Sequence, residues 1–136
     1  MSGPRTSSLN KKPWGTEELW ASTHHSVGKI LTIHAGHRLS RKYHRIKTHT
    51  IRILEGELNL EIGPRFEGET LQVVQLSPGM VYHLSARTIH RFCAGAQGVV
   101  ILEISNQGPS DSVRLADDYK RIGDEEIPAR TPHSDK

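Results

Sequence analysis

The chain of 136 residues carries a formal net charge of +3, with 35% hydrophobic and 24% charged residues. This length allows one domain whose core needs no cross-links, and the single cysteine, Cys93, excludes an internal disulfide and fits a reducing compartment. No uninterrupted apolar segment occurs near the amino terminus, so we expect no signal peptide or membrane anchor and predict a cytoplasmic protein. Lysines and arginines cluster at 38–47, but with Tyr43 as their one aromatic neighbour, neither nucleic acid nor a membrane is expected as a partner.

The first third of the chain combines polar segments with one clear strand. Residues 1–11 are polar and rich in Ser, Gly and Pro, which predicts a flexible tail. Residues 14–22 fit either a short helix or an edge strand, because their periodicity does not decide between the two. Residues 29–34 have the composition of a strand bounded by glycines.

The middle of the chain predicts a succession of short strands. The runs 48–54 and 57–62 are expected to form a hairpin with its turn at Glu55-Gly56. Turn residues such as Pro78-Gly79 separate the strands that follow. These further strands are predicted at 70–76, 80–84, 90–93 and 99–105.

Short strands at regular spacing, without a long amphipathic helix, are typical of an antiparallel barrel or sandwich. Residues 111–121 are expected to add a helical turn or an ordered strap, and 122–136 a second flexible tail. The sequence therefore predicts one all-β domain over 12–121.

Histidines are the first candidates for a functional site, because imidazole is the commonest metal ligand among side chains. His44 and His49 are five positions apart, which on a straight strand places them on opposite faces. They can bind one ion only if the chain bends or changes strand between them. His90 and His83 come from other strands and can join them at the mouth of a barrel. Of the other histidines, His24, His25 and His133 are expected on the surface.

Several segments resemble, in order, small cupins related to the mannose-6-phosphate isomerase domain of type II phosphomannose isomerases. The resemblance spans about residues 12–121 and implies a cupin fold, a jelly-roll barrel also called a double-stranded β-helix. The segments that carry it are Lys12-Pro-Trp-Gly15, Glu17-Glu-Leu-Trp20, Val27-Gly-Lys-Ile-Leu31, Ala35-Gly36, Arg38-Leu-Ser40, Tyr43-His44, Leu76-Ser-Pro-Gly79, Tyr82-His83, Thr88-Ile-His-Arg-Phe92 and Ser110–Tyr119.

Cupins carry a His-x-His pair, a glutamate seven residues before a glycine, and a third histidine in a second motif. By this resemblance His44 matches the first histidine, Gly56 the glycine and His90 the third histidine. His49 stands in place of the glutamate, and Ile46 in place of the second histidine. His83 is a possible replacement for the missing ligand.

The resemblance implies a divalent metal (zinc, iron, nickel or manganese) held by histidines, and aldose–ketose isomerisation of a sugar phosphate. An ion would polarise the substrate oxygens while a base moves a proton between neighbouring carbons. No single residue is assigned as the base. The carboxylates considered are Glu17, Glu18, Glu55, Glu57 and Glu61.

A phosphate group would require a cationic clamp. Lys29 shares strand parity with the apolar Leu31 and Ile33, which predicts that it points inward. Arg41 and Tyr82 are further candidates for substrate contacts. Less favoured are Lys12, Arg38 and Arg87, while Trp14 and Trp20 are expected to close the barrel core.

The alternative to an isomerase is a non-catalytic cupin with a degenerate metal site that binds a sugar or a small anion. In both readings the partner is a small molecule, a sugar or sugar phosphate. We also expect a homodimer, because an open barrel of short strands has edges to protect.

Overall fold

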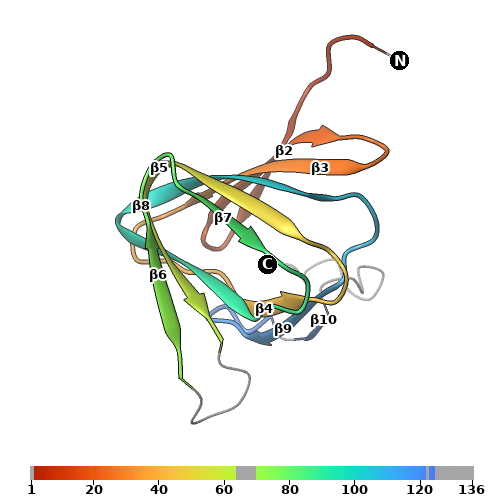
Figure 1. The fold of residues 1–136 in the computed structure, drawn as a ribbon. Helices are drawn as coiled ribbons and strands as arrows, with labels where there is room; N and C mark the ends of the chain where they lie inside the picture. The colour runs from red at the N-terminus through yellow and green to blue at the C-terminus, as the bar shows by residue number, and fades with distance from the viewer. Residues whose placement is uncertain (1, 64–69, 122, 125–136) are drawn as a thin grey trace.

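The structure is a computed structural model that describes residues 2–63, 70–121 and 123–124 (Figure 1). All regular elements in these ranges are strands, which confirms the all-β prediction. No helix in these ranges is long and apolar enough to cross a membrane. The strands are β1 (Ser8–Lys12), β2 (Gly15–Ser22), β3 (Ser26–Ile33), β4 (Arg41–His44), β5 (His49–Ile62), β6 (Gln72–Leu76), β7 (Val81–Leu84), β8 (His90–Asn106), β9 (Ser112–Ala116) and β10 (Gly123–Asp124).

The strands pair antiparallel in one sheet that curls back on itself (Figure 1). The hydrogen-bonded order β1-β2-β3-β8-β4-β9-β10 runs through the centre, and β5 pairs with β6, β7 and β8. The long strand β8 therefore takes part in both walls of the curl. Its first half pairs with β4 and its second half with β3.

The predicted hairpin at Glu55-Gly56 is wrong, because 49–54 and 57–62 belong to the single strand β5. Both halves pair with β8, and the register shifts on each side of Glu55 and Gly56. Gly56 adopts a φ of 73° there, so the glycine makes a bulge that bends the strand instead of reversing it. The expected break between 90–93 and 99–105 is likewise a continuous part of β8.

Alternating side chains on β3, β5 and β8 fill the interior of the curl. Inward residues near one end of these strands are apolar and fully buried, such as Ile33, Ile53 and Ile101. The inward positions toward the other end are occupied by Lys29, His49 and Glu103. One end of the barrel is therefore a closed core, while the other end is a polar cup. The core residues are Trp14, Leu31, Ile33, Leu39, Ile51, Ile53, Leu58, Leu60, Leu76, Leu84, Phe92, Val99 and Ile101.

The ends of the domain differ in part from their predictions. Residues 8–11, expected in the amino-terminal tail, form β1 together with Lys12 and pair with β2. Residues 15–22 form a strand, not a helix, and β9 takes the place of a helical turn after Asp111. Gly123 and Asp124 pair with β9, and the rest of the predicted tail 122–136 lies outside the described residues.

Trp20, which was expected to close the core with Trp14, is instead 43% exposed. Its ring covers Gly28 of the neighbouring strand, where a Cβ atom would lie 2.7 Å from the indole. Trp14 is 3% exposed and packs in the core as predicted. The two tryptophans therefore lie on opposite faces of the sheet.

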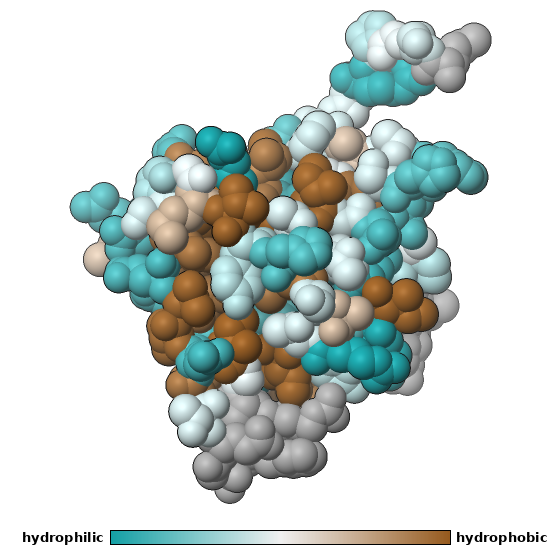
Figure 2. Space-filling model, viewed as in Figure 1, coloured by the Kyte–Doolittle hydropathy of each residue, from teal (hydrophilic) through white to brown (hydrophobic). Residues whose placement is uncertain are grey.

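Apolar side chains also gather on the outside, over β5, β6 and β7 on the viewer's left in Figure 2. Among the described residues, the exposed apolar side chains of this region include Val73 and Val81, with Met80 at the start of β7. In the described sheet β6 and β7 each pair only with β5, so their outer edges have no strand partner there.

Candidate functional site

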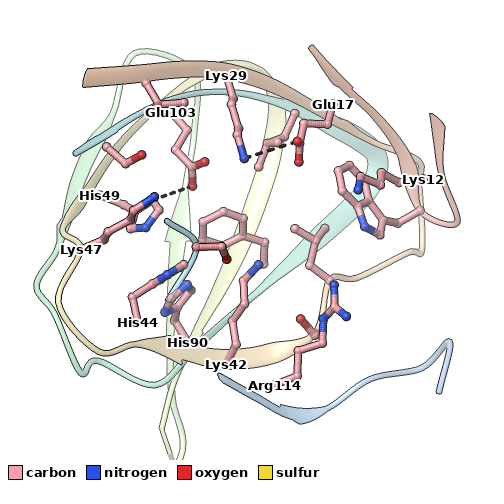
Figure 3. A pocket seen from close by; sticks show the side chains of 18 of the residues that line it. Lys12, Glu17, Lys29, Lys42, His44, Lys47, His49, His90, Glu103 and Arg114 are labelled. Atoms are coloured by element: carbon pink, nitrogen blue, oxygen red, sulfur yellow. Dashed lines mark ion pairs between the residues drawn. The ribbon is translucent and has the colours of Figure 1, made fainter. Parts of the chain in front are cut away.

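The polar cup is a cavity of about 120 Å³ that contains three of the predicted site histidines (Figure 3). At about 30 Å³ for each water molecule, this volume corresponds to roughly four waters, enough for a small anionic group. Its cationic lining residues outnumber its acidic ones. The cations are Lys12, Lys29, Lys42, Lys47, Arg114 and Arg121, and the carboxylates are Glu17 and Glu103.

A bend in the chain between β4 and β5 brings His44 and His49 together. Asp111 stabilises this bend, because its Oδ2 accepts hydrogen bonds from the backbone N–H groups of Ile46, at 2.6 Å, and Lys47, at 2.8 Å. The imidazole centres of His44 and His49 consequently lie 4.0 Å apart. The bend that the sequence analysis required for a shared site is therefore present.

His90, at the start of β8, completes the cluster. Its ring lies 5.8 Å from that of His44, with the two planes 22° apart. His83 does not join them, because it is exposed on β7 and its Nδ1 pairs with Oγ1 of Thr50 at 2.7 Å. The expectation that His83 replaces a missing ligand is thus not supported by its position.

The alignment of Ile46 with the second histidine of the cupin motif is also wrong. Ile46 lies in the bend and is 80% exposed, outside the cup. Lys42 precedes His44 by two residues and lies on the same face of β4, so Lys42 takes the place of the first histidine of the pair and His44 that of the second. In the sheet register Lys42 is directly opposite His90 on one side and Arg114 on the other.

Each of the three imidazoles has one oxygen atom close to its Nδ1 nitrogen. Nδ1 of His44 donates to Oδ1 of Asp111 at 3.0 Å, and Nδ1 of His90 donates to the carbonyl of Thr88 at 2.8 Å. Nδ1 of His49 lies 3.2 Å from Oε2 of Glu103. This pattern leaves Nε2 as the nitrogen available to a ligand. In His49, which is 8% exposed, both ring nitrogens are buried and neither meets hydrogen-bond geometry with a described residue, so Nδ1 is near Glu103 by distance only and Nε2 has no partner in the described part of the chain.

Burial and the surrounding charges keep two of these rings neutral. Burial lowers the pKa of His90 to about 3, with a smaller contribution from the charge of Lys42. Burial likewise lowers the pKa of His44 to about 4, assisted by the charges of His49 and Lys42. At neutral pH both rings are therefore uncharged, and each can donate at Nδ1 and accept at Nε2.

The surroundings of Glu103 favour its charged form, whereas those of His44 and His90 favour the neutral form. Burial by itself would raise the pKa of this carboxyl, but the contact with His49 and the charges of Lys29 and Lys42 lower it to about 2. Glu103 is thus a carboxylate at neutral pH. Its charge partly offsets the lysines inside the cup.

Lys29 points into the cup, as its strand parity predicted, from the wall opposite Lys42 (Figure 3). It lies directly across the β3–β8 pairing from Glu103, and its Nζ is 3.4 Å from Oε2 of Glu17. Glu17 is the one carboxylate among the considered bases that lines the cup.

The other two predicted substrate residues lie elsewhere. Tyr82 on β7 packs against the hydrophobic core and is not part of the cup lining. Arg41 lies outside the lining as well, with its Nη2 3.4 Å from Oε1 of Glu61. Neither side chain is placed to contact a ligand inside the cup.

Sequence reasoning missed Lys42, Glu103 and Asp111. For two of them, the sequence contains a pattern that indicates an inward side chain. Lys42 has the strand parity of His44, and Glu103 is a lone charge in an apolar run with the inward parity of Ile101. Asp111 gave none, because its partners His44, Ile46 and Lys47 lie more than sixty positions earlier in the chain.

The donor types in the cup suit a divalent transition metal, but their arrangement does not. Two imidazoles bound to one ion at 2.0–2.1 Å keep their ring centres about 5 Å apart, whereas those of His44 and His49 are 4.0 Å apart. No three His, Cys, Asp or Glu side chains converge at a common point in the described part of the chain. The ammonium group of Lys42 also lies in the same cup and opposes a second cation.

Neither the family models nor the curated proteins include a match to this sequence. Several solved structures match the fold. The capsular polysaccharide assembling protein CapF from Staphylococcus aureus aligns with a TM-score of 0.73 at 12% identity, over 83% of this chain and 33% of its own. An uncharacterized conserved protein from Klebsiella pneumoniae with a double-stranded β-helix domain aligns with a TM-score of 0.63 at 15% identity, over 85% of both chains.

Oxalate decarboxylase from Bacillus subtilis, described with Mn(II) centres, aligns with a TM-score of 0.63 at 10% identity, over 75% of this chain and 28% of its own. The chain thus spans about a third of the length of CapF and less of oxalate decarboxylase. Identities this low show the shared fold alone. Together with the curled antiparallel sheet, they show that this chain has the double-stranded β-helix fold of the cupins.

Proposed function

We propose that the cup binds a small, oxygen-rich anion of the sugar-phosphate or sugar-acid class. The observation that carries this proposal is the excess of lysine and arginine side chains around three clustered histidines in one cavity. Charge-assisted hydrogen bonds from lysine and arginine to phosphate or carboxylate oxygens are strong, so a lining rich in these residues suits an anion. The neutral imidazoles and the carboxylates Glu17 and Glu103 provide acceptors for the hydroxyl groups of such a ligand.

Calorimetric titration of the full chain with three probes tests this function. The probes are mannose 6-phosphate, free mannose and inorganic phosphate. We expect binding of the phosphate ester, weaker binding of inorganic phosphate and none of the neutral sugar. Equal affinity for mannose and its phosphate would contradict an anion site. Raising the salt concentration should weaken binding, because salt ions screen the attraction between the anion and the partly exposed lysines of the cup.

A metal-dependent aldose–ketose isomerase, like mannose-6-phosphate isomerase, is the second candidate. It is favoured by the oxygen acceptors at the three Nδ1 atoms, which leave Nε2 available for zinc, iron, nickel or manganese. This function requires the rings of His44 and His49 to move apart. Elemental analysis of the purified protein, followed by a coupled assay of mannose 6-phosphate conversion with and without chelator, tests it. Stoichiometric metal and chelator-sensitive turnover would favour the isomerase over a binding protein.

We also propose that two copies of the chain associate as a homodimer in the cytoplasm. The apolar side chains exposed on β6 and β7, including Val73 and Val81, support association through this region. Sedimentation equilibrium should give twice the chain mass, and Val73→Lys combined with Val81→Lys should shift it toward the monomer. A monomeric wild-type protein would contradict the dimer.

A further inference from the structure

We propose that Lys42 supplies the positive charge at the centre of the cup, so that an anionic group binds between Lys42 and Lys29 without a metal ion. This inference rests on the proposed function, because it names the group that holds the anion. It also has a consequence of its own, which is that the wild-type cup excludes divalent metals.

The register of the sheet places Lys42 at the centre of the site. It lies directly opposite His90 on β8 and opposite Arg114 on β9, and it shares a strand face with His44. Figure 3 shows its side chain extending into the cavity from the β4 wall. In the described sheet, Lys42 is the one residue of β4 that has a cup-lining residue directly opposite it on each neighbouring strand.

Lys29 completes the clamp from the opposite wall. Its side chain points into the same cavity from β3 (Figure 3). Its pairing with Glu17 and its position opposite Glu103 orient the ammonium group without removing it from the cup. Two ammonium groups that approach one cavity from opposite walls are suited to a phosphate or carboxylate, whose oxygens can face both.

His49 provides a second, independent sign that a ligand belongs here. Its side chain is 9% exposed, it lines the cup, and its Nε2 has no hydrogen-bond partner among the described residues. Leaving a buried polar nitrogen unpaired is unfavourable. A hydroxyl group of the bound molecule would donate a hydrogen bond to this nitrogen while the anionic group contacts the two lysines.

The same arrangement explains why the histidines do not form a metal site. A divalent ion bound by His44, His49 and His90 would share a small cavity with the ammonium groups of Lys42 and Lys29. Like charges repel more strongly in a partly buried cavity than in bulk water. Replacing Lys42 by a neutral imidazole removes one of these charges and adds a donor beside His44 and His90. The histidine cluster should then accept a metal.

Two substitutions of Lys42 test the inference in opposite directions. Lys42→Gln should weaken binding of mannose 6-phosphate at least tenfold, as expected for loss of a hydrogen bond to a charged group. Lys42→His should lose affinity for the anion in the same way and should gain stoichiometric binding of Zn²⁺ or Ni²⁺, measured by calorimetry with the metal alone. Lys11→Gln on β1 removes one exposed charge away from the cup and should stay within twofold of the wild type.

Wild-type affinity for mannose 6-phosphate should be the same with and without EDTA. Binding that EDTA abolishes, wild-type protein that binds Zn²⁺ as tightly as the Lys42→His variant, or Lys42→Gln affinity within twofold of the wild type would each overturn the inference. Lys42→Met provides a second neutral variant if Lys42→Gln does not fold, as judged by circular dichroism. If the wild type binds none of the phosphate probes, the proposed function fails, and the comparison of Zn²⁺ binding between wild type and Lys42→His still decides the role of Lys42.

Discussion

Asp111 and His44, 67 positions apart in the sequence, are joined by a hydrogen bond of 3.0 Å between Oδ1 and Nδ1. The second oxygen of Asp111 accepts the backbone N–H groups of Ile46 and Lys47. One carboxylate thus orients a cup histidine and stabilises the bend that brings His49 beside it. The geometry of the histidine cluster depends on this contact between β9 and the β4–β5 bend.

Removing the Asp111 carboxylate should therefore destabilise the protein and disturb the cup. Asp111→Ala eliminates three hydrogen bonds at once, and we expect a loss of about 2–4 kcal/mol in the free energy of unfolding. Urea denaturation monitored by tryptophan fluorescence measures this loss. Glu57→Ala is the matched control, because Glu57 is exposed and its carboxylate accepts a single hydrogen bond from Gln75, whose loss should cost about 1 kcal/mol or less. Equal losses for the two variants would contradict the structural role of Asp111.

Gly56 should tolerate no side chain, in contrast to Gly79. Both adopt positive φ, 73° and 90°, but a Cβ at position 56 would lie 2.1 Å from the carbonyl oxygen of Gly98, whereas nothing lies within 4 Å of one at position 79. Gly79→Ala introduces backbone strain alone, which should lower the free energy of unfolding by roughly 1–2 kcal/mol. Gly56→Ala adds a clash with the β8 backbone and should cost at least about 3 kcal/mol, measured by thermal and urea unfolding. A Gly56→Ala variant as stable as Gly79→Ala would show that β5 does not pass β8 so closely.

Acidification should destabilise the fold through the neutral histidines. The pKa values of His44 and His90 are lowered to about 4 and about 3, so between these values and the unfolded value near 6.5 the unfolded chain binds more protons. Stability therefore rises with pH across this window and is lost as pH falls from about 6.5 toward 4 and below. For His44 alone the change is on the order of 3 kcal/mol.

The carboxylates add to this acid sensitivity at lower pH. The pKa of Glu103 and that of Asp111 are both lowered in the folded state, so the stability they contribute is present above about pH 4 and is lost below it. Urea midpoints measured from pH 7.5 to pH 3 separate the two regions. His44→Gln, which keeps a donor for Asp111 but does not titrate, should flatten the profile between pH 6.5 and pH 4. An unchanged profile would show that His44 is not held neutral by burial.

The two histidines that differ most in placement should differ in their effect on ligand affinity. His83→Ala removes an exposed ring that contacts Thr50 outside the cup, and affinity for mannose 6-phosphate should stay within twofold of the wild type. His49→Ala removes a buried imidazole of the cup lining and should weaken affinity about tenfold. Calorimetry of the two variants, each checked for unaltered circular dichroism, makes the comparison. A larger effect at His83 would place the ligand on the outer face of β7.

Strand parity accounts for much of what could be read in advance. The all-β class, the inward direction of Lys29 and the position of most strands follow from alternation and turn residues that act within a few positions. The same reasoning misread Glu55-Gly56 as a hairpin turn. A glycine with positive φ also forms a bulge, and only the partner strand β8 decides between the two.

The sequence by itself determined that the chain has short antiparallel strands and a supply of histidines and lysines at their ends. Which of these side chains share a cavity was decided only by the curl of the sheet, which places β4 and β3 on opposite walls and returns Asp111 to the bend before His49. These contacts join residues many positions apart, and their geometry depends on register shifts and on a bend that local periodicity does not encode. That is why His44, His49 and His90 could be named as candidates from their residue type, whereas the contact of Asp111 with His44 was visible only in the folded chain.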